Sequence, residues 1–325
     1  MTFNISRRKL IGTTTAGVAA AAVAGGPAAF AQDKPTIKVG SKDFTEQLII
    51  GEIVAQLLED DGFPVERQFN IGTLIVHEAL INGDVDTYVE YTGTGLIAIL
   101  GQELPPRDEG AGEDAAATPG ATPGSIGGYA DTVYDIVAEA YPEEFSVEWL
   151  EPWGFNNTYA LAMRRSHAEE LGVTTISDLI PIAGDLSLGS TAETIAREDG
   201  VMGLENTYGL DFSDVVSLDA GLMYTAIDGE EVDVITAFAT DGRIESMDLV
   251  LLEDDLEFFP PYHAAPIVRQ DMLEQAPEIA DVLNTLAGEI DDATMTEMNF
   301  MADEEGMEPA DIARNFLTEG GYIEG

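Results

Sequence analysis

The sequence predicts an α/β protein of two lobes, with the second lobe inserted between parts of the first. Short apolar strands alternate with amphipathic helices from Thr36 onward, and the alternation resumes after an interruption near residue 105. A chain of 325 residues is also long enough for about two domains. These observations define the fold class.

The first lobe is expected to begin with a strand–helix–strand–helix–strand series, which implies a mainly parallel sheet with helices on both faces. The expected strands are Thr36–Gly40, Val65–Phe69 and Thr87–Tyr91, and the second helix is Leu74–Ile81. The first helix is expected to follow the first strand. Asp43 and Glu46 have the spacing of a capping box at its amino-terminal end. Its apolar face comprises Leu48, Ile49, Ile53, Leu57 and Leu58.

The third strand ends at Tyr91 and runs into the turn Thr92-Gly93-Thr94-Gly95. Glycines allow a tight turn that leaves amides and hydroxyls free for a ligand. In open α/β sheets, ligands bind outside the carboxyl ends of strands, where Tyr91 and Thr94 are expected. From this segment alone, an ordinary strand-to-helix turn with a half-buried tyrosine is the alternative interpretation.

The stretch Pro105–Gly128 has no hydrophobic periodicity and contains an ATPG repeat, so we predict a flexible surface insertion. A helix at Tyr129–Ala140 should follow it. Further strands are expected at Thr158–Arg164, Leu186–Gly189, Val215–Leu218, Val232–Phe238 and Ala265–Arg269. Helices are expected at Thr191–Glu198, around Leu222–Ile227, and along the tail Met272–Leu317.

The net charge of −47 excludes nucleic acid as a partner and disfavours adsorption to anionic lipid. Acidity this strong indicates a heavily solvated surface adapted to salt or acid. The chain contains no cysteine, which excludes disulfides, a thiol nucleophile, cysteine-ligated metals and a lipid-modified amino-terminal cysteine.

Residues 1–31 are expected to form a cleaved export signal of the twin-arginine type. The pattern Ser6-Arg7-Arg8-Lys9-Leu10-Ile11 precedes a mild alanine-rich stretch, and Ala29-Phe30-Ala31 gives a cleavage site. The apolar stretch is too weak for a transmembrane anchor. We therefore expect a soluble mature protein that is exported, either periplasmic or at the extracellular face of the cytoplasmic membrane.

No motif in the sequence indicates an enzyme, a metal site or a cofactor. His77, His167 and His263 are widely spaced and lack a metal-ligand pattern. The acidic run Glu253-Asp254-Asp255 lacks the spacing of a calcium loop, and there is no phosphate loop, nucleophile elbow or haem motif.

Several separated motifs resemble one family. They are GSKDFTEQ at 40–47, EALINGDVDTYVEYTGTG at 78–95, WGFNNTYALAM at 153–163, ATDGRI at 239–244, LEDD at 252–255 and PPYHAAPIVR at 260–269. In this order they resemble the substrate-binding proteins of ABC importers for quaternary ammonium osmoprotectants such as glycine betaine, choline and proline betaine. The resemblance runs from Ile37 to about Gly321 and lacks a counterpart for the Pro105–Gly128 insertion.

The resemblance implies a type II periplasmic-binding-protein fold with a ligand cleft between the lobes. Lobe I would comprise residues 36–156 plus 262–325 and lobe II residues 157–261, with crossings near Phe155–Thr158 and Pro260–Tyr262. Ligand binding would favour a closed form that docks on a membrane permease. We expect a monomer without a cofactor.

The ligand chemistry explains why the family uses aromatic side chains. A trimethylammonium group has no N–H, so hydrogen bonds cannot hold it, whereas aromatic faces attract it by about 0.5–2 kcal/mol per contact. By their place in the family motifs, the cage residues are Tyr91, Tyr159, Phe238 and Tyr262. Relatives often have tyrosine where this chain has Phe238. Each aromatic side chain taken alone is more often part of a core.

The resemblance also assigns polar groups. Arg197 would bind the ligand carboxylate, as a planar guanidinium can. Glu193, one helical turn before Arg197, is also among the expected ligand-binding residues. A surface i,i+4 pair between Glu193 and Arg197 is the alternative interpretation. Thr94 is the betaine-compatible choice at a position where choline-restricted relatives can carry aspartate.

Lys42 and Gln47 would lie near the ligand, although Lys42 could also be a surface charge beside a helix. Two other functions remain open: a binding protein for another small solute such as an amino acid or an organic anion, and an enzyme on the same scaffold. An amino acid would need an acidic partner for its primary ammonium.

Overall fold

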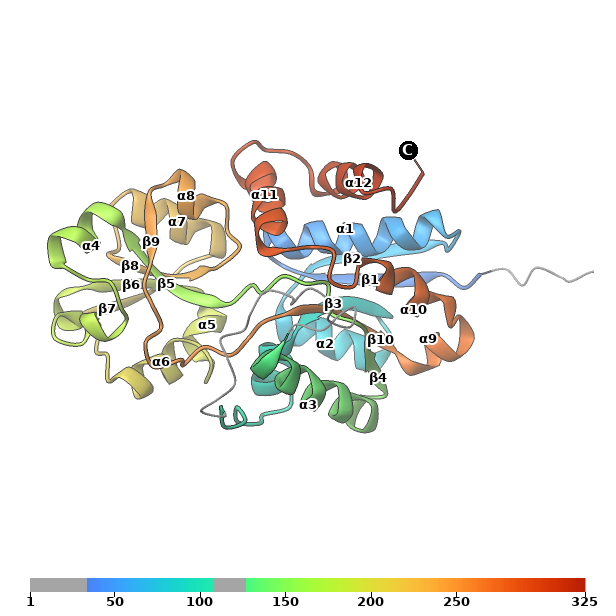
Figure 1. The fold of residues 1–325 in the computed structure, drawn as a ribbon, viewed down its shortest axis with the longest axis horizontal. Coiled ribbons are helices and arrows are strands. Elements are labelled where there is room, and N and C mark those ends of the chain that lie inside the picture. Colours follow the sequence, from blue (N-terminus) through green and yellow to red (C-terminus); the bar gives the residue numbers. More distant parts are fainter. Residues whose placement is uncertain (1–33, 108–126, 325) are drawn as a thin grey trace, which may run out of the picture. The chain divides into compact units, whose positions relative to one another are not determined.

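The computed structural model describes residues 34–107 and 127–324. The predicted export signal and most of the predicted insertion therefore lie outside the described residues. The described chain forms two five-stranded sheets, each with helices on both faces, which confirms the predicted two-lobed α/β class (Figure 1).

The first sheet has the strand order β2-β1-β3-β10-β4. Its strands are β1 (Ile37–Lys42), β2 (Val65–Ile71), β3 (Thr87–Tyr91), β4 (Val147–Trp149) and β10 (Ala264–Arg269). β1 pairs in parallel with β2 and β3, whereas β10 runs antiparallel to β3 and β4. A strand from late in the chain thus completes the sheet that the amino-terminal strands begin.

Helices cover both faces of the first sheet. They are α1 (Thr45–Asp60), α2 (Thr73–Asn82), η1 (Thr94–Ile99), α3 (Gly128–Phe145), α9 (Gln270–Gln275), α10 (Glu278–Leu283), η4 (Asn284–Leu286), α11 (Asp292–Asp303) and α12 (Pro309–Glu319). Tyr88 packs in the core with α2 and α3, while Val89 packs in the core with α1 and α12. Successive strand residues point to opposite faces, so both faces of β3 are buried.

The second sheet has the order β7-β6-β8-β5-β9. Its strands are β5 (Tyr159–Arg164), β6 (Ser187–Ser190), β7 (Asp214–Ser217), β8 (Val234–Phe238) and β9 (Leu249–Leu251). Its helices are α4 (Arg165–Leu171), η2 (Ser177–Leu179), η3 (Ala183–Asp185), α5 (Ala192–Ala196), α6 (Val201–Tyr208), α7 (Ala220–Asp228) and α8 (Arg243–Ser246). β6 is parallel to β7 and β8, and β5 is antiparallel to β8 and β9.

Two connecting segments link the sheets, one from β4 to β5 and one from β9 to β10. They lie side by side, because Asn156 and His263 form an antiparallel bridge. Tyr262 N donates to Asn156 Oδ1 (2.7 Å), and Asn157 N donates to Tyr262 O (3.1 Å). The paired segments place Asn157 and Tyr262 between the two sheets.

Some local predictions were wrong. The capping box of Asp43 and Glu46 does not form: α1 starts after Phe44, no side chain caps it, and Glu46 is buried. The tail is helical, as expected, and comprises four α-helices and η4, whereas β4 and β9 were not expected. The predicted helix at Thr191–Glu198 is shorter, because α5 ends at Ala196 and leaves Arg197 extended. None of the described helices has the length and apolarity to span a bilayer.

Candidate functional site

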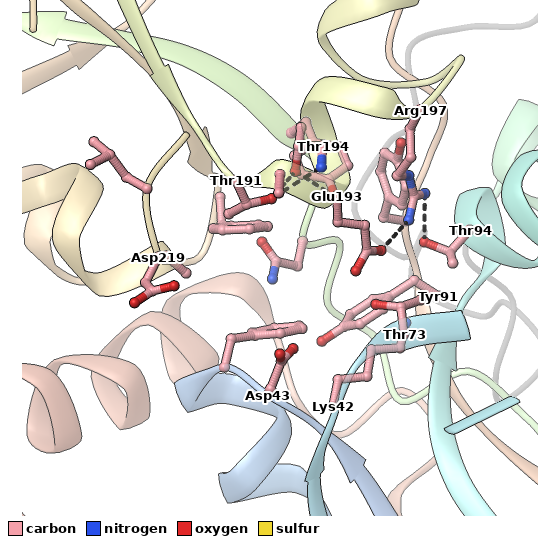
Figure 2. A pocket seen from close by; sticks show the side chains of 18 of the residues that line it. Lys42, Asp43, Thr73, Tyr91, Thr94, Thr191, Glu193, Thr194, Arg197 and Asp219 are labelled. Carbon is pink, nitrogen blue, oxygen red and sulfur yellow. Dashed lines mark hydrogen bonds and ion pairs between the residues drawn. The ribbon is translucent and has the colours of Figure 1, made fainter. Parts of the chain in front are cut away.

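A cavity of about 760 Å³ is lined by residues of both sheets and their connections (Figure 2). Its lining includes Lys42 at the end of β1, Tyr91 at the end of β3 and Phe238 at the end of β8. Thr191 follows β6 and caps α5, accepting a hydrogen bond from Thr194 N at 3.0 Å. Both sheets therefore present the carboxyl ends of parallel strands to one cavity, where ligands bind in α/β proteins.

Aromatic rings form a continuous series along the cavity. Tyr159 lies 5.4 Å from Phe238 and 5.2 Å from Tyr262, measured between ring centroids. Phe44 stacks on Phe238 at 5.6 Å with an interplanar angle of 5°, and on Tyr91 at 6.3 Å. The four predicted cage residues thus share one cavity wall. Phe44 joins them, although sequence reasoning missed it within GSKDFTEQ.

Lys42 lies behind the ring of Tyr91. Its Nζ atom is 4.8 Å from the ring centroid and forms an ion pair with Glu90. The residue is 2% exposed, so the interpretation of Lys42 as a surface charge was wrong. Burial lowers the pKa of Lys42, and Glu90 opposes that shift. The cavity therefore has a buried ion pair against its aromatic wall.

Arg197 bridges the two lobes. Its Nε and Nη2 atoms donate to Asp199 at 2.7 and 2.5 Å, and Nη1 donates to Glu193 at 3.1 Å. Nη2 also donates to Thr94 Oγ1 at 3.1 Å, as Figure 2 shows. The predicted pair with Glu193 does form, but it lines the cavity instead of lying on an exposed surface.

Asp199 was not expected from the sequence. Its Oδ2 atom also accepts a hydrogen bond from Tyr262 Oη at 2.7 Å, so the carboxylate links Arg197 to the aromatic wall. Burial lowers the pKa of Arg197, but Tyr159 and Asp199 outweigh burial and raise it. Because AETIAREDG carries several acidic residues, nothing in the sequence singled out Asp199.

Glu46 is a buried residue that the sequence assigned to a helix cap instead of the site. Its carboxylate accepts hydrogen bonds from Tyr91 Oη (2.7 Å), Asn157 Nδ2 (2.8 Å), Thr240 Oγ1 (2.5 Å) and Asn299 Nδ2 (2.9 Å). It lines a smaller cavity of about 240 Å³, which shares Phe44 and Phe238 with the larger one. The capping-box spacing concealed this role, because the donors are distant in sequence.

Eight of the nine predicted ligand-binding residues line the larger cavity: Lys42, Tyr91, Thr94, Tyr159, Glu193, Arg197, Phe238 and Tyr262. The structure does not bring Gln47 to the wall. Its Nε2 atom donates to Val89 O at 2.9 Å and its Oε1 atom accepts from Lys42 N at 3.2 Å, so it ties β1 to β3.

Acidic side chains flank the cavity on both lobes. Asp43 precedes α1, and Asp219 precedes α7, and both line the cavity (Figure 2). Within the described part of the chain, no three His, Asp or Glu side chains form a metal-binding group. The arrangement offers π faces, buried cations and carboxylates, which suits a ligand that carries charges of both signs.

Comparison with known proteins identifies relatives along most of the chain. Residues 35–319 match the family described as the substrate-binding domain of the ABC-type glycine betaine transport system. A carnitine transport binding protein of Listeria monocytogenes is 34% identical over 296 residues, covering 90% of this chain and 89% of the relative. The glycine-betaine-binding protein of Pseudomonas aeruginosa is 35% identical over 297 residues, covering 87% and 88%.

Solved structures agree with the fold. A structure described as a glycine betaine/carnitine/choline ABC transporter superposes with a TM-score of 0.67 at 32% identity, covering 88% of this chain and 99% of that one. Together with the two sheets and their connections, this match confirms the predicted type II periplasmic-binding-protein fold.

Proposed function

Because the chain belongs to the family of substrate-binding domains of ABC-type glycine betaine transport systems, we propose that it captures a zwitterionic quaternary ammonium compound for import. A single observation carries the proposal: the rings of Tyr91, Tyr159, Phe238 and Tyr262 line one cavity together with Arg197. The rings would hold the ammonium group, and the cationic side would hold a carboxylate.

The hydrogen bonds of Arg197 support a carboxylate beside it. A guanidinium has five N–H groups, and four bonds from Arg197 go to Asp199, Glu193 and Thr94. Within residues 34–107 and 127–324, one N–H of Nη1 has no acceptor and can bind a ligand. Since Thr94 Oγ1 accepts from Arg197, its own O–H can donate to the same ligand carboxylate. We propose Thr94 and Arg197 as the carboxylate-binding pair.

The remaining expectations follow from this role. We propose that the protein is exported through its amino-terminal signal, acts as a monomer without catalysis, and delivers its ligand to a membrane permease. The lobes would meet at the connections near residues 156–158 and 260–262. Arg197 and Thr94 lie on different lobes and are in contact, so ligand bound between them would favour the closed form.

Isothermal titration calorimetry tests the proposal. Protein that has been unfolded, dialysed and refolded to remove bound solutes should release or absorb heat with glycine betaine, carnitine or proline betaine. Choline, which lacks a carboxylate, should bind more weakly. Glycine and proline serve as controls, because their ammonium groups carry N–H donors that π faces cannot satisfy. Binding of these amino acids without any binding of betaines would overturn the proposal.

A further inference from the structure

Glu46 is a buried carboxylate whose four hydrogen-bonding partners are all neutral groups. It lies in the first turn of α1 and is 2% exposed. A buried carboxylate is costly unless hydrogen bonds replace its hydration. Burial raises the pKa of Glu46, and its four hydrogen bonds oppose that rise. Burial of the Glu46 carboxylate therefore carries a substantial desolvation cost, which its hydrogen bonds offset in part.

The four donors come from four separate segments. Tyr91 ends β3, Asn157 lies in the connection from β4 to β5, and Asn299 lies in α11. Thr240 follows β8 in the second lobe. Oε1 accepts from Tyr91 and Asn157, and Oε2 accepts from Thr240 and Asn299. A carboxylate has about four acceptor positions, so this group is saturated only when both lobes contact it.

The segment of the second lobe that contains Thr240 packs closely against α11. Asn299 Nδ2 donates to Thr240 O at 2.9 Å as well as to Glu46. A Cβ atom on Gly242 would lie 2.6 Å from Cβ of Phe300, so a side chain at 242 would push the lobes apart. Arg243 Nη2 also lies 3.3 Å from Asp303 Oδ2. Thr240 is thus held at the carboxylate by a well-packed contact.

We propose that Glu46 is a positioning residue that couples this contact between the lobes to the orientation of the Tyr91 ring in the ligand cavity. One carboxylate oxygen accepts a hydrogen bond from the Tyr91 hydroxyl, and the other accepts one from the Thr240 hydroxyl of the second lobe. Separation of the lobes removes the Thr240 donor and leaves Oε2 undersatisfied. Closure of the lobes restores the Thr240 hydrogen bond and fixes the orientation of the Tyr91 ring. The identity of the ligand rests on the proposed function, whereas the coupling itself does not.

The coupling can be measured without ligand. Because the chain has no cysteine, Glu78→Cys on α2 and Asn206→Cys on α6 give two exposed labelling positions, one on each lobe. Energy transfer between dyes then reports the closed fraction. Thr240→Val and Glu46→Gln should each lower that fraction. Thr236→Val, which removes a buried hydroxyl of β8 that contacts Ser190, is the matched control and should leave it unchanged.

Ligand affinity gives the second measurement. A hydrogen bond to a charged group contributes about 1.5–3 kcal/mol, so Thr240→Val should weaken glycine betaine binding by about tenfold or more. In the Glu46→Gln background the same substitution should cost less than about threefold, because the charged acceptor is gone. Equal losses in both backgrounds would overturn the coupling.

A double-mutant cycle keeps the inference testable if Glu46→Gln does not fold. Tyr91→Phe and Thr240→Val remove the two hydroxyls that share the carboxylate while leaving both side-chain shapes nearly intact. Coupling through Glu46 requires their effects on the closed fraction to be non-additive, and additive effects would contradict it. If no quaternary ammonium compound binds the wild type, the proposed ligand is wrong, while the ligand-free cycle still decides this inference.

Discussion

At the scale of single residues, Arg197 connects the two lobes and is the proposed donor to the ligand carboxylate. Its guanidinium is held by Asp199 and Glu193 and reaches Thr94 on the other lobe. Two carboxylates fix the position of the cation, and the remaining N–H can be directed at an anion. Preorganisation of this kind reduces the side-chain entropy that the protein would otherwise lose when a ligand binds.

Replacing Arg197 should affect ligands with a carboxylate and ligands without one differently. Arg197→Ala removes the carboxylate donor and leaves Asp199 without its cation, so the local charge becomes more negative. Glycine betaine binding should weaken by about 10- to 100-fold, while choline binding should change by less than about threefold. Calorimetry with both ligands checks this. Equal losses for the two ligands would remove Arg197 from the carboxylate role.

Phe44 is expected to be part of the cage. Its ring stacks on Phe238 and Tyr91, which come from different lobes. Phe44→Ala should weaken binding of every quaternary ammonium ligand by about 10- to 30-fold, since a π contact and an aromatic pair are each worth about 1 kcal/mol. Phe316→Ala removes the Phe316–Tyr322 stack, which lies outside the cavity lining, and is the control. Loss of affinity in the control alone would contradict this role.

At the scale of elements, a buried histidine, His263, lies immediately before β10. His263 is bridged to Asn156, and its backbone N–H donates to Thr92 Oγ1 at 3.1 Å. Burial lowers the pKa of His263 to about 4. The folded protein therefore keeps the ring neutral at a pH where the unfolded chain would protonate it. His263 lies beside the segments that connect the lobes, so its protonation at low pH should destabilise the junction between the two sheets.

The sign of the pH effect follows from linkage. Between pH 6.5 and about 4, the unfolded chain binds a proton at His263 that the folded protein does not, so acidification lowers the free energy of unfolding by up to about 3 kcal/mol. His263→Phe should reduce the fall in melting temperature between pH 7 and pH 5. Between pH 7 and pH 8, the melting temperatures of the two proteins should change by the same amount. An unchanged fall below pH 7 would contradict this assignment.

At the scale of the whole molecule, the net charge of −47 should govern the response to salt. Like charges on the surface repel each other in the compact state, and salt shortens the Debye length to about 3 Å at 1 M. The melting temperature should therefore rise as sodium chloride increases from about 0.05 M to 1 M. Differential scanning calorimetry checks this, and a melting temperature that falls over the same range would contradict it.

Much of the fold was predictable because its signals are local. The alternation of strands and helices placed β1, β2, β3, β5, β6, β7, β8 and β10 within a few residues of their observed positions. β4 and β9 were missed because three-residue strands such as Val147–Trp149 carry too little periodicity to detect. Their pairing depends on the neighbouring strands β10 and β5.

The candidate site was partly predictable for the same reason. Tyr91 and Phe238 end strands, and motif resemblance placed Tyr159, Tyr262 and Arg197 beside them. Glu46 and Asp199 could not be assigned in this way. The donors to Glu46 lie 45, 111, 194 and 253 residues along the chain, so no local pattern contains them.

The sequence by itself determined the α/β class, the family motifs and the aromatic residues of the candidate site. Hydrophobic periodicity and strand ends are properties of neighbouring residues, and they survive without knowledge of packing. Only the tertiary structure decided that Glu46 is a buried acceptor shared by both lobes rather than a helix cap. A carboxylate bonds to whichever donors packing brings to it, and here packing joined segments from both ends of the chain.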